Sequence, residues 1–436
     1  MTPAPSGRTV PAYRRTIWWK TASASPATSP LFDGASVDVA VIGAGFTGLT
    51  AAWHLARRGA RVAVLEADSI GSGASGLNAG FVVPNFAKAD PAAVLARLGD
   101  ERGRRLLAMI GEGADRVFGT IREHGIDCDA EQVGWMHVAH SPAMLAMLRL
   151  RAGAWQGLGR PIRMLDESAA RALSGARHCF GALLDPSGGT LHPLNYAYGL
   201  VRLASKAGAI IHEQAPIDAV LRDAGGWRLE SRGRTLRAGK VFLCTNAAAL
   251  GVARCLNRAV VPLRVYQVAT RPLAKEIARR ISPERNPVAD TRANLFTYRL
   301  DREDRLISGG MAILPFRAEA RMARMIAGRL ARELSLPALP ELDCVWQGTA
   351  AMTTDFLPHL YEFGPGFVGG IGCNGRGIAL TAMLGEAMAD AACGRALSDL
   401  PVPLASHRAI PLRVLAEAAP SIAIAEAKWR DWRDRL

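Results

Sequence analysis

Residues 37–67 contain the pattern that most constrains how this chain can fold. A strand-like β-branched run leads into Gly43, Gly45 and Gly48, and apolar residues at helical spacing then precede a second strand that ends at Glu66. In a G-x-G-x-x-G turn the first glycine makes the bend, the second lets a phosphate approach the backbone, and the third lets the helix pack against the strand. The pattern therefore predicts a dinucleotide site at a helix N-terminus, with a purely structural glycine turn as the alternative.

Glu66 narrows the choice of dinucleotide. Its carboxylate can accept hydrogen bonds from the ribose hydroxyls of an adenosine, and its charge would repel a 2′-phosphate. The residue pattern alone therefore leaves FAD and NAD open and disfavours NADP.

Composition narrows the class of protein. The chain has 436 residues, 49% of them hydrophobic, which is enough for two cores or one large interwoven core. No apolar run approaches the roughly 20 residues of a membrane-spanning helix, and the first residues lack the apolar core of a secretory signal. Seven scattered cysteines without a C-x-x-C pair indicate reduced thiols, so we expect a cytoplasmic protein with no transmembrane segment.

The net charge of +14 has two interpretations. Nucleic-acid binding is one, but the basic residues are spread along the whole chain and no nucleic-acid motif accompanies them. We favour an arginine-rich solvated surface that attracts acidic small molecules, and we expect no nucleic-acid partner.

A resemblance to a known family begins after Glu66. The segment Ala74-Ser75-Gly76-Leu77-Asn78-Ala79-Gly80 follows the glycine turn, and an aromatic-containing arm precedes it. This arrangement resembles the FAD-dependent amine and amino-acid oxidoreductases of the D-amino-acid oxidase superfamily, and among them the γ-glutamylputrescine oxidoreductase branch. Members often carry Arg and Gly where Leu77 and Ala79 stand. The resemblance implies that this loop runs along the isoalloxazine ring.

A second glycine turn supports FAD over NAD. Residues 372–377 follow a predicted strand and open a predicted helix over 378–392. One dinucleotide needs one phosphate cradle, so a second turn suggests an anionic centre elsewhere on the same ligand. In the superfamily this turn faces the pyrimidine edge of the flavin. The helix dipole, together with Arg376, would then stabilise negative charge on the reduced flavin.

Motif and resemblance together give the expected cofactor contacts. In the superfamily a backbone amide, placed here at Ile217, holds the adenine, and a strand end at Thr245 closes over the phosphate side. The full set is Gly43, Ala44, Gly45, Phe46, Thr47, Gly48, Glu66, Ala67, Ser75, Gly76, Asn78, Ile217, Thr245, Asn246, Gly372, Asn374, Gly375, Arg376, Gly377 and Ile378. Sarcosine-oxidising relatives attach flavin through a Cys where this chain has Ala351, so noncovalent FAD is expected.

The sequence determines the residues that contact the substrate less clearly than those that contact the cofactor. Strands predicted over 261–271, 295–300 and 306–311 resemble the antiparallel sheet that roofs the flavin in the family. Tyr298 and Arg299 are the candidate catalytic, substrate-facing residues, although strand alternation allows only one of them to face the flavin. Relatives place an oxygen-activating Lys where this chain has Ile307, which leaves oxygen or another electron acceptor open.

Two histidine hypotheses remain. His192 could be a base, but a His before Pro at a predicted helix start is more often structural. His137 and His140 lie three residues apart without a nearby acid or Cys to complete a site, so no metal is expected.

The expected fold class is α/β, with a Rossmann-like FAD-binding domain interwoven with an antiparallel-sheet substrate domain. Within the arm, Trp18 and Trp19 are predicted to be packing anchors rather than a substrate entrance. The predicted division is an N-terminal arm over 1–36, an FAD-binding domain over 37–90, 191–250 and 345–395, a substrate domain and helical cap over 91–190 and 251–344, and a tail helix over 396–436.

The predicted function is oxidation of a C–N bond in a small amine or amino acid. The resemblance implies hydride transfer to the flavin and hydrolysis of the imine product. No residue pattern demands strong acid–base catalysis, because the cofactor carries the difficult step. The alternatives are an NAD-dependent dehydrogenase with an unrelated substrate domain and a basic binding protein that uses a nucleotide structurally.

Overall fold

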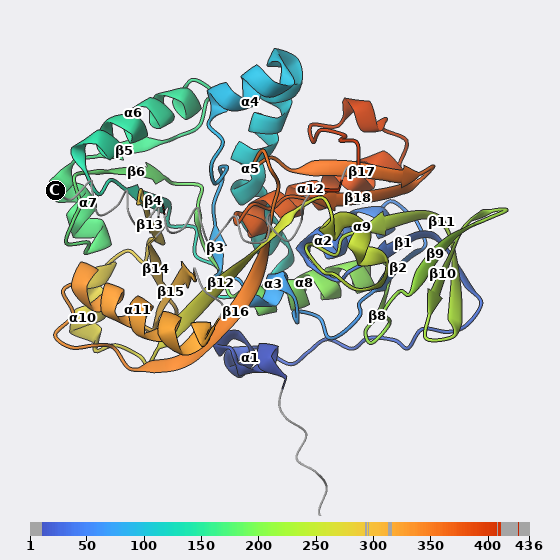
Figure 1. The fold of residues 1–436 in the computed structure, drawn as a ribbon, viewed down its shortest axis with the longest axis horizontal. Helices are drawn as coiled ribbons and strands as arrows, with labels where there is room; N and C mark the ends of the chain where they lie inside the picture. The colour runs from blue at the N-terminus through green and yellow to red at the C-terminus, as the bar shows by residue number, and fades with distance from the viewer. Residues whose placement is uncertain are drawn as a thin grey trace, which may run out of the picture.

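Two eight-stranded sheets form the body of the protein (Figure 1). This computed structural model describes residues 11–292, 294, 296–312, 316–407, 409–410 and 426. The expected α/β class is confirmed by the mixture of a largely parallel sheet and a largely antiparallel one. The predicted tail helix lies almost entirely outside the described residues.

The first sheet carries the glycine turns. Its order is β17-β18-β11-β1-β2-β8, with a β9–β10 hairpin attached to β11. The four pairings from β18 to β8 are all parallel, so the carboxyl ends of these strands share one edge of the sheet. The strands are β1 (Ala35–Ile42), β2 (Val62–Leu65), β8 (Ile210–His212), β9 (Ala219–Asp223), β10 (Gly226–Ser231), β11 (Arg234–Leu243), β17 (His359–Gly364) and β18 (Phe367–Ile371).

Strand alternation divides the first sheet into two buried faces. Val39 and Val41 of β1 belong to the large core that also contains the helices α2 (Phe46–Ala56), α8 (Pro193–Lys206) and α12 (Gly377–Ala392). Ala40 and Ile42 point the other way, into a smaller core with the β9–β10 hairpin and the short helix α9 (Arg254–Asn257). Burial on both faces explains why these strands read as continuous apolar runs.

The second sheet has the order β16-β12-β15-β14-β13-β4-β6-β5, and its pairings are antiparallel except between β13 and β4. Its outer face packs against three helices, and its inner face turns toward the first sheet. The elements are β4 (Trp135–Val138), β5 (Arg163–Leu165), β6 (Ala182–Asp185), β12 (Val261–Thr270), β13 (Val288–Asp290), β14 (Thr297–Leu300), β15 (Leu306–Met311), β16 (Leu342–Met352), α7 (Glu167–Ser174), α10 (Lys275–Ile281) and α11 (Ala318–Glu333).

One predicted domain boundary needs correction. The sequence predicts that residues from 345 onward belong to the FAD-binding domain, but β16 pairs with β12 along its whole length and is an edge of the second sheet. The chain crosses to the first sheet only afterwards, at β17. The alternating sequence of β16 could not reveal which sheet it joins, because pairing partners are set by tertiary contacts.

The remaining segments cover the junction of the two sheets. Apolar residues of three helices pack into the large core: α4 (Pro91–Leu98), α5 (Asp100–His124) and α6 (Pro142–Gln156). The two-stranded antiparallel sheet of β3 (Phe81–Val82) and β7 (Gly189–Thr190) and the short helix α3 (Ala74–Leu77) lie between the two large sheets, and the arm helix α1 (Ile17–Thr21) runs beneath them (Figure 1). Three 3-10 turns complete the described elements: η1 (Ala12–Arg15), η2 (Gly251–Ala253) and η3 (Leu397–Asp399).

No helix in the described ranges is long and apolar enough to cross a membrane.

Candidate functional site

The first glycine turn connects β1 to α2 as the spacing predicts. Gly43 has φ +104°, and a Cβ there would lie 2.7 Å from the carbonyl oxygen of Cys244 at the end of β11. A Cβ on Gly48 would lie 2.0 Å from the carbonyl oxygen of Gly43. Both positions exclude any larger side chain, because the clashing atoms are backbone.

The mouth of this turn leaves room for a ligand. A Cβ on Gly45 would meet only the Ser75 hydroxyl, at 3.1 Å, and the Phe46 N–H donates to the same hydroxyl at 3.0 Å. The buried Thr245 hydroxyl, next to Gly43, has no hydrogen-bond partner within the described residues. A free hydroxyl beside a glycine turn at a helix N-terminus suits a phosphate group.

Glu66 stands where β2 ends, beside the same turn. Its carboxylate accepts the N–H of Ala44 at 2.9 Å and that of Asp68 at 3.1 Å. Burial raises the pKa of Glu66, and the two N–H groups oppose that rise. The N–H of Ala215 donates to the carbonyl oxygen of Glu66 at 2.8 Å, so the segment that contains Ile217 lies next to this acid. Exposed Ala67 follows Glu66 at the edge of the sheet.

The loop over residues 74–80 connects the first turn to the second sheet. A Cβ on Gly76 would lie 2.1 Å from the carbonyl oxygen of Gly71, which explains the small residue there. The amide nitrogen of Asn78 donates to the carbonyl oxygens of Ala74 and Ser75, and its Oδ1 accepts the N–H of Gly80. The Asn78 side chain therefore holds the shape of the loop. Only the backbone groups of Asn78 are available to contact a ligand.

The second glycine turn repeats the first at the end of β18. Gly372 also has φ +104°, and a Cβ there would lie 2.8 Å from the carbonyl oxygen of Leu357. Buried Asn374 holds the turn: its Oδ1 accepts the N–H of Thr353 at 2.8 Å, and its Nδ2 donates to the carbonyl oxygen of Gly372 at 2.9 Å. Gly375 has open space around its Cβ position, so ligand atoms could approach its backbone.

The helix α12 begins at Gly377, and the preceding residue, Arg376, points to the second sheet. Its guanidinium lies 4.9 Å from the ring centre of Trp135 on β4. Burial, with a smaller effect of the Arg151 charge, lowers the pKa of Arg376 to about 10, so it stays charged at neutral pH. Within the described ranges Arg376 forms no ion pair. Ile378 is buried and anchors the first turn of the helix.

The two turns are neighbours because their helices touch. A Cβ on Gly385 of α12 would lie 2.4 Å from the carbonyl oxygen of Thr47 in the first turn of α2. Between the two turns, Asn246 has φ +50° and its Nδ2 donates to the carbonyl oxygen of Thr349 on β16. The structure thus brings the predicted cofactor contacts to one edge of the first sheet and to the junction between the sheets.

The two substrate candidates point in opposite directions. Tyr298 lies in the outer core of the second sheet, where its hydroxyl donates to the carbonyl oxygen of Ser174 at 2.7 Å, and it is 1% exposed. The prediction that Tyr298 faces the substrate is therefore wrong. Arg299 is on the inner face, but its Nη1 donates to the carbonyl oxygens of Gly80 and Leu191, both at 3.1 Å.

His192 is a helix cap that fixes the arm. Its Nδ1 accepts the N–H of Asn195 at the start of α8, so its Nε2 carries the hydrogen and donates to the Thr21 hydroxyl at 3.0 Å. Burial, with the Arg299 charge, lowers the pKa of His192 to about 3. With both ring nitrogens in use, His192 fits the structural alternative and not a base.

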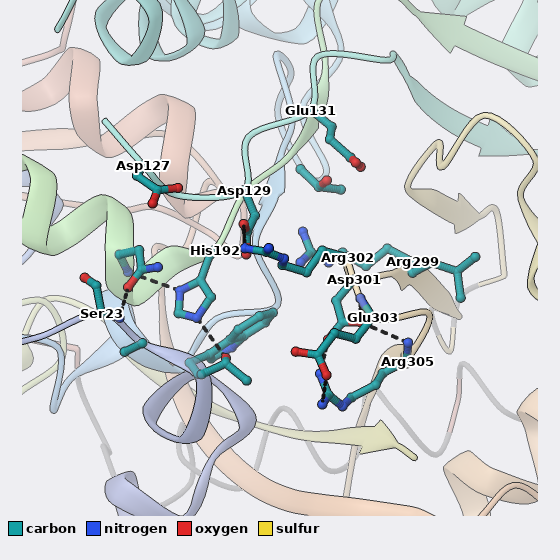
Figure 2. A pocket seen from close by; sticks show the side chains of 16 residues that line it. Ser23, Asp127, Asp129, Glu131, His192, Arg299, Asp301, Arg302, Glu303 and Arg305 are labelled. Atoms are coloured by element: carbon teal, nitrogen blue, oxygen red, sulfur yellow. Dashed lines mark hydrogen bonds and ion pairs between the residues drawn. The ribbon is translucent and has the colours of Figure 1, made fainter. Parts of the chain in front are cut away.

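A cavity of about 320 Å³ lies beside Arg299 and His192, between the arm and the β14–β15 hairpin (Figure 2). Its lining includes Asp127, Asp129, Glu131, Asp301 and Glu303 together with Arg302 and Arg305. Most of these charges pair with each other, as in the Asp301–Arg305 contact of 3.1 Å. The cavity is thus a polar surface with more acidic than basic side chains, and Arg299 is part of its lining.

Sequence reasoning missed two residues of this region. The indole nitrogens of Trp18 and Trp346 donate to the carbonyl oxygens of Asn78 and Leu77, at 2.8 and 2.9 Å. Trp18 is the packing anchor that was predicted, and it is 1% exposed. The only sequence signal for the hydrogen bond from Trp18 to the loop was the pair Trp18–Trp19 in an arm of otherwise mostly small and polar residues.

No group of His, Cys, Asp or Glu within the described residues is arranged to hold a metal ion.

The parallel sheet, its two glycine turns and the roofing sheet define a dinucleotide-dependent α/β protein. The sequence matches the family described as FAD dependent oxidoreductase over residues 38–391. The chain belongs to this family, and its cofactor is FAD. The NAD-dependent alternative is not favoured by this membership.

Individual relatives agree with the family. The γ-glutamylputrescine oxidoreductase of Escherichia coli K12 is 29% identical over 363 residues, which cover 83% of this chain and 84% of that protein. The glycine oxidase structure from Geobacillus kaustophilus has a TM-score of 0.66 at 24% identity and covers 82% of this chain and 95% of that one. The L-proline dehydrogenase structure from P. horikoshii has a TM-score of 0.71 at 19% identity, covering 84% and 96%. At these identities the two structures show a shared fold.

Proposed function

We propose that this FAD-dependent oxidoreductase oxidises the C–N bond of a small amine or amino acid that carries a carboxylate. The observation that carries the proposal is the spacing of the two glycine turns. They end β1 and β18, and a single strand, β11, separates these in the first sheet. Strands lie about 4.8 Å apart, so the turns are roughly 10 Å apart, which suits two contacts on one extended ligand.

The cofactor residues divide into two groups. Gly45, the N-terminus of α2 and the Thr245 hydroxyl would hold the pyrophosphate, while Glu66 and the Ile217 segment would hold the adenosine. The loop over 74–80 and the turn over 372–377 would hold the ring system. The Thr245 hydroxyl, which has no partner in the described residues, and the absence of a side chain at Gly45 beside the Ser75 hydroxyl support this fit.

Bound FAD would supply an acceptor for the hydride that leaves the carbon bearing the amine. The chain positions the two partners and keeps a positive potential at the N-terminus of α12, where Arg376 adds a full charge without an ion-pair partner in the described residues. The nitrogen lone pair of the substrate forms the C=N bond as the hydride leaves. Water then adds to this imine and releases a carbonyl compound and the amine or ammonia.

Several features support a carboxylate-bearing substrate. The protein has a net charge of +14. Arg376 is near Arg151 and His137, and the pKa of His137 is lowered by burial and by these two arginines. The name of the Escherichia coli relative specifies a γ-glutamyl amine, which contains an amino-acid carboxylate. The polar side of the substrate would therefore lie toward α12.

The experiment is an anaerobic titration of the purified, FAD-loaded protein with amino acids and γ-glutamyl amines, followed by the visible flavin spectrum. Bleaching by a carboxylate-bearing amine supports the proposal, and matched amines without the carboxylate should bleach more weakly. A flavin spectrum that no amine bleaches would contradict C–N oxidation. Reoxidation of the bleached protein by oxygen or by a dye then identifies the electron acceptor.

We also propose a cytoplasmic location without a nucleic-acid partner. All seven cysteines are free, which suits a reducing compartment. Failure of a fluorescent RNA or DNA to bind at physiological salt is the expected result, whereas binding that weakens steeply with salt would contradict it.

A further inference from the structure

Three side chains from three distant segments hold three carbonyl groups of the loop over 74–80. Trp346 of β16 donates to Leu77 at 2.9 Å, and Trp18 of α1 donates to Asn78 at 2.8 Å. Arg299 of β14 donates to the carbonyl oxygen of Gly80 at 3.1 Å. We call these donors, Trp18, Arg299 and Trp346, the loop clamp.

The members of the loop clamp also pack against one another. The guanidinium of Arg299 lies 5.3 Å from the ring centre of Trp18, and the rings of Trp18 and Trp346 meet edge to face at 6.3 Å. Their exposed fractions are 1% for Trp18 and 3% for each of the other two. The Leu77 and Asn78 carbonyls have no other printed donor and would lose their partner if the loop moved, whereas the Gly80 carbonyl also accepts the N–H of Leu191 at 2.9 Å, so the two tryptophans resist a shift of the loop most strongly.

Arg299 is a buried cation that serves neutral acceptors. Burial lowers its pKa to about 10, while the charges of Asp301 and Glu131 in the neighbouring cavity oppose that effect (Figure 2). Arg299 therefore remains charged at neutral pH. The acidic side chains of the cavity form no direct ion pair with Arg299 in the described residues, and its Nη1 donates to the carbonyl oxygens of Gly80 and Leu191.

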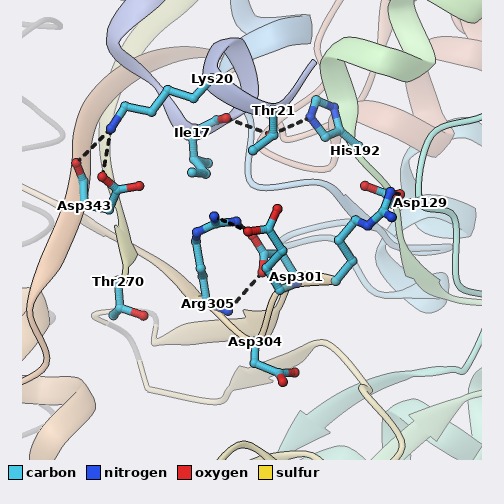
Figure 3. A network of polar contacts seen from close by, with 12 residues as sticks. Ile17, Lys20, Thr21, Asp129, His192, Thr270, Asp301, Asp304, Arg305 and Asp343 are labelled. Atoms are coloured by element: carbon cyan, nitrogen blue, oxygen red, sulfur yellow. Dashed lines mark hydrogen bonds and ion pairs between the residues drawn. The ribbon is translucent and has the colours of Figure 1, made fainter. Parts of the chain in front are cut away.

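The arm helix that carries Trp18 is itself fixed at two points (Figure 3). Lys20 forms an ion pair with Asp343 at 2.8 Å, and the Thr21 hydroxyl joins His192 to the carbonyl oxygen of Ile17. Trp18 thus reaches the loop from a helix anchored to β16 on one side and to α8 on the other.

Peptide geometry gives the clamp a consequence on the opposite side of the loop. In a trans peptide the C=O of one residue and the N–H of the next point in opposite directions, and no cis peptide is present in the described chain. Holding the carbonyls of Leu77 and Asn78 therefore directs the N–H groups of Asn78 and Ala79 away from the clamp.

We propose that Trp18 and Trp346 are positioning residues for the flavin, because they aim the N–H groups of Asn78 and Ala79 at the ring system, and that Arg299 supports them by holding the Gly80 carbonyl and packing on the Trp18 ring. The inference rests on the proposed FAD site. Fixed N–H donors beside the ring favour its electron-rich reduced form, since they need no reorganisation when the charge develops. In this account Arg299 acts through the loop and does not bind the substrate.

Two substitutions test the clamp, one at each tryptophan. Trp18→Phe and Trp346→Phe each remove one N–H donor and keep an aromatic ring. Each should lower the midpoint potential of bound FAD and weaken FAD binding about three- to tenfold, the size of one net hydrogen bond.

Trp19→Phe is the matched control. Trp19 is on the same helix, and its indole nitrogen has no hydrogen-bond partner in the described part of the chain. This variant should keep the wild-type potential and the wild-type affinity for FAD.

A wild-type potential in both folded clamp variants would overturn the inference, even if their melting temperatures fall. If Trp18→Phe does not fold, Trp346→Phe alone decides. Failure of the wild-type protein to bind FAD would instead overturn the proposed cofactor site, so the two failures are distinguishable.

Discussion

The two glycine turns have the same backbone but opposite chemistry. Gly43 and Gly372 both have φ +104°, and both follow strands of the parallel sheet and precede long helices. The first turn donates the N–H of Ala44 to an acid, Glu66, whereas the second has a cation, Arg376, at its helix N-terminus. A repeated backbone can therefore serve two ends of one ligand when the neighbouring side chains differ in charge.

They also differ in what fixes their shape. The first turn is closed by direct backbone contact, since Gly48 and Cys244 leave no space for a Cβ. The second has a similar backbone contact at Gly372, where a Cβ would lie 2.8 Å from the carbonyl oxygen of Leu357, and is held in addition by a side chain, because Asn374 links the turn to Thr353. The two turns therefore differ at their later glycines: Gly48 is enclosed by backbone, whereas Gly375 has open space, so Gly48 should tolerate substitution less than Gly375.

The largest expected effect comes from Gly48→Ala. Its Cβ would lie 2.0 Å from the carbonyl oxygen of Gly43, so we expect loss of FAD binding or of folded protein. The matched variant Gly375→Ala meets no atom within 4 Å, although its φ of +80° adds about 1 kcal/mol of strain. In thermal unfolding of the apoprotein, Gly375→Ala should therefore lose far less stability than Gly48→Ala. Equal losses of stability in Gly48→Ala and Gly375→Ala would contradict the predicted difference between the two positions.

The next effect concerns Asp355, which lies in the segment that supports the second turn. Burial opposes its ionisation, but the hydrogen bond and charge of His359 prevail and lower the pKa of Asp355 from 3.8 to about 2. Its folded pKa is below the unfolded value, so its stabilisation is present above pH 4 and lost as the pH falls through 2. Asp355→Asn should destabilise the protein by about 2 kcal/mol at pH 7, measured by urea unfolding. A difference that does not diminish toward pH 2 would refute this origin.

Arg376→Gln tests the difference in charge between the two glycine turns. Removing one charge near the anionic reduced ring should lower the midpoint potential by about 20–40 mV, equivalent to about 1–2 kcal/mol for a two-electron couple. Arg376→Lys keeps the charge and should retain most of the potential. An unchanged potential in Arg376→Gln would show that the helix N-terminus alone provides the field.

The smallest effect is the pH dependence of the apoprotein at the first turn. Burial raises the pKa of Glu66, so the folded state holds its proton more tightly than the unfolded state. Stability from this group is therefore present below pH 4.5 and falls as the pH rises through the raised value, the opposite sign to Asp355. Glu66→Gln should remove this loss of stability, which is measured as the unfolding temperature of the apoprotein between pH 4 and 8. Identical pH profiles for the variant and the wild type would contradict it.

Sequence reasoning succeeded where spacing determines structure. Gly43, Gly48 and Gly372 needed no tertiary information, because each follows a recognisable strand and precedes a recognisable helix. Strand alternation correctly required Tyr298 and Arg299 to face opposite sides, but it could not say which side faces the first sheet. The direction depends on pairing with β13 and β15, which is a tertiary choice.

The limits of prediction appear at contacts between distant segments. Trp18 and Asn78 are 60 residues apart, and Trp346 and Leu77 are 269 apart. Nothing in the local pattern of either tryptophan shows which carbonyl it will reach. The same holds for Arg376 and Trp135, whose contact joins the second turn to the second sheet.

The most direct test of the central claim, that the two turns hold opposite ends of one FAD, is calorimetric titration of ADP into the apoproteins of the wild type, Glu66→Gln and Arg376→Gln. ADP carries only the adenosine end of the cofactor. We expect Glu66→Gln to weaken ADP binding about tenfold through the lost charge-assisted hydrogen bonds, and Arg376→Gln to leave it unchanged. Equal weakening of ADP binding by both substitutions would contradict the assignment of the two turns to separate ends of the ligand.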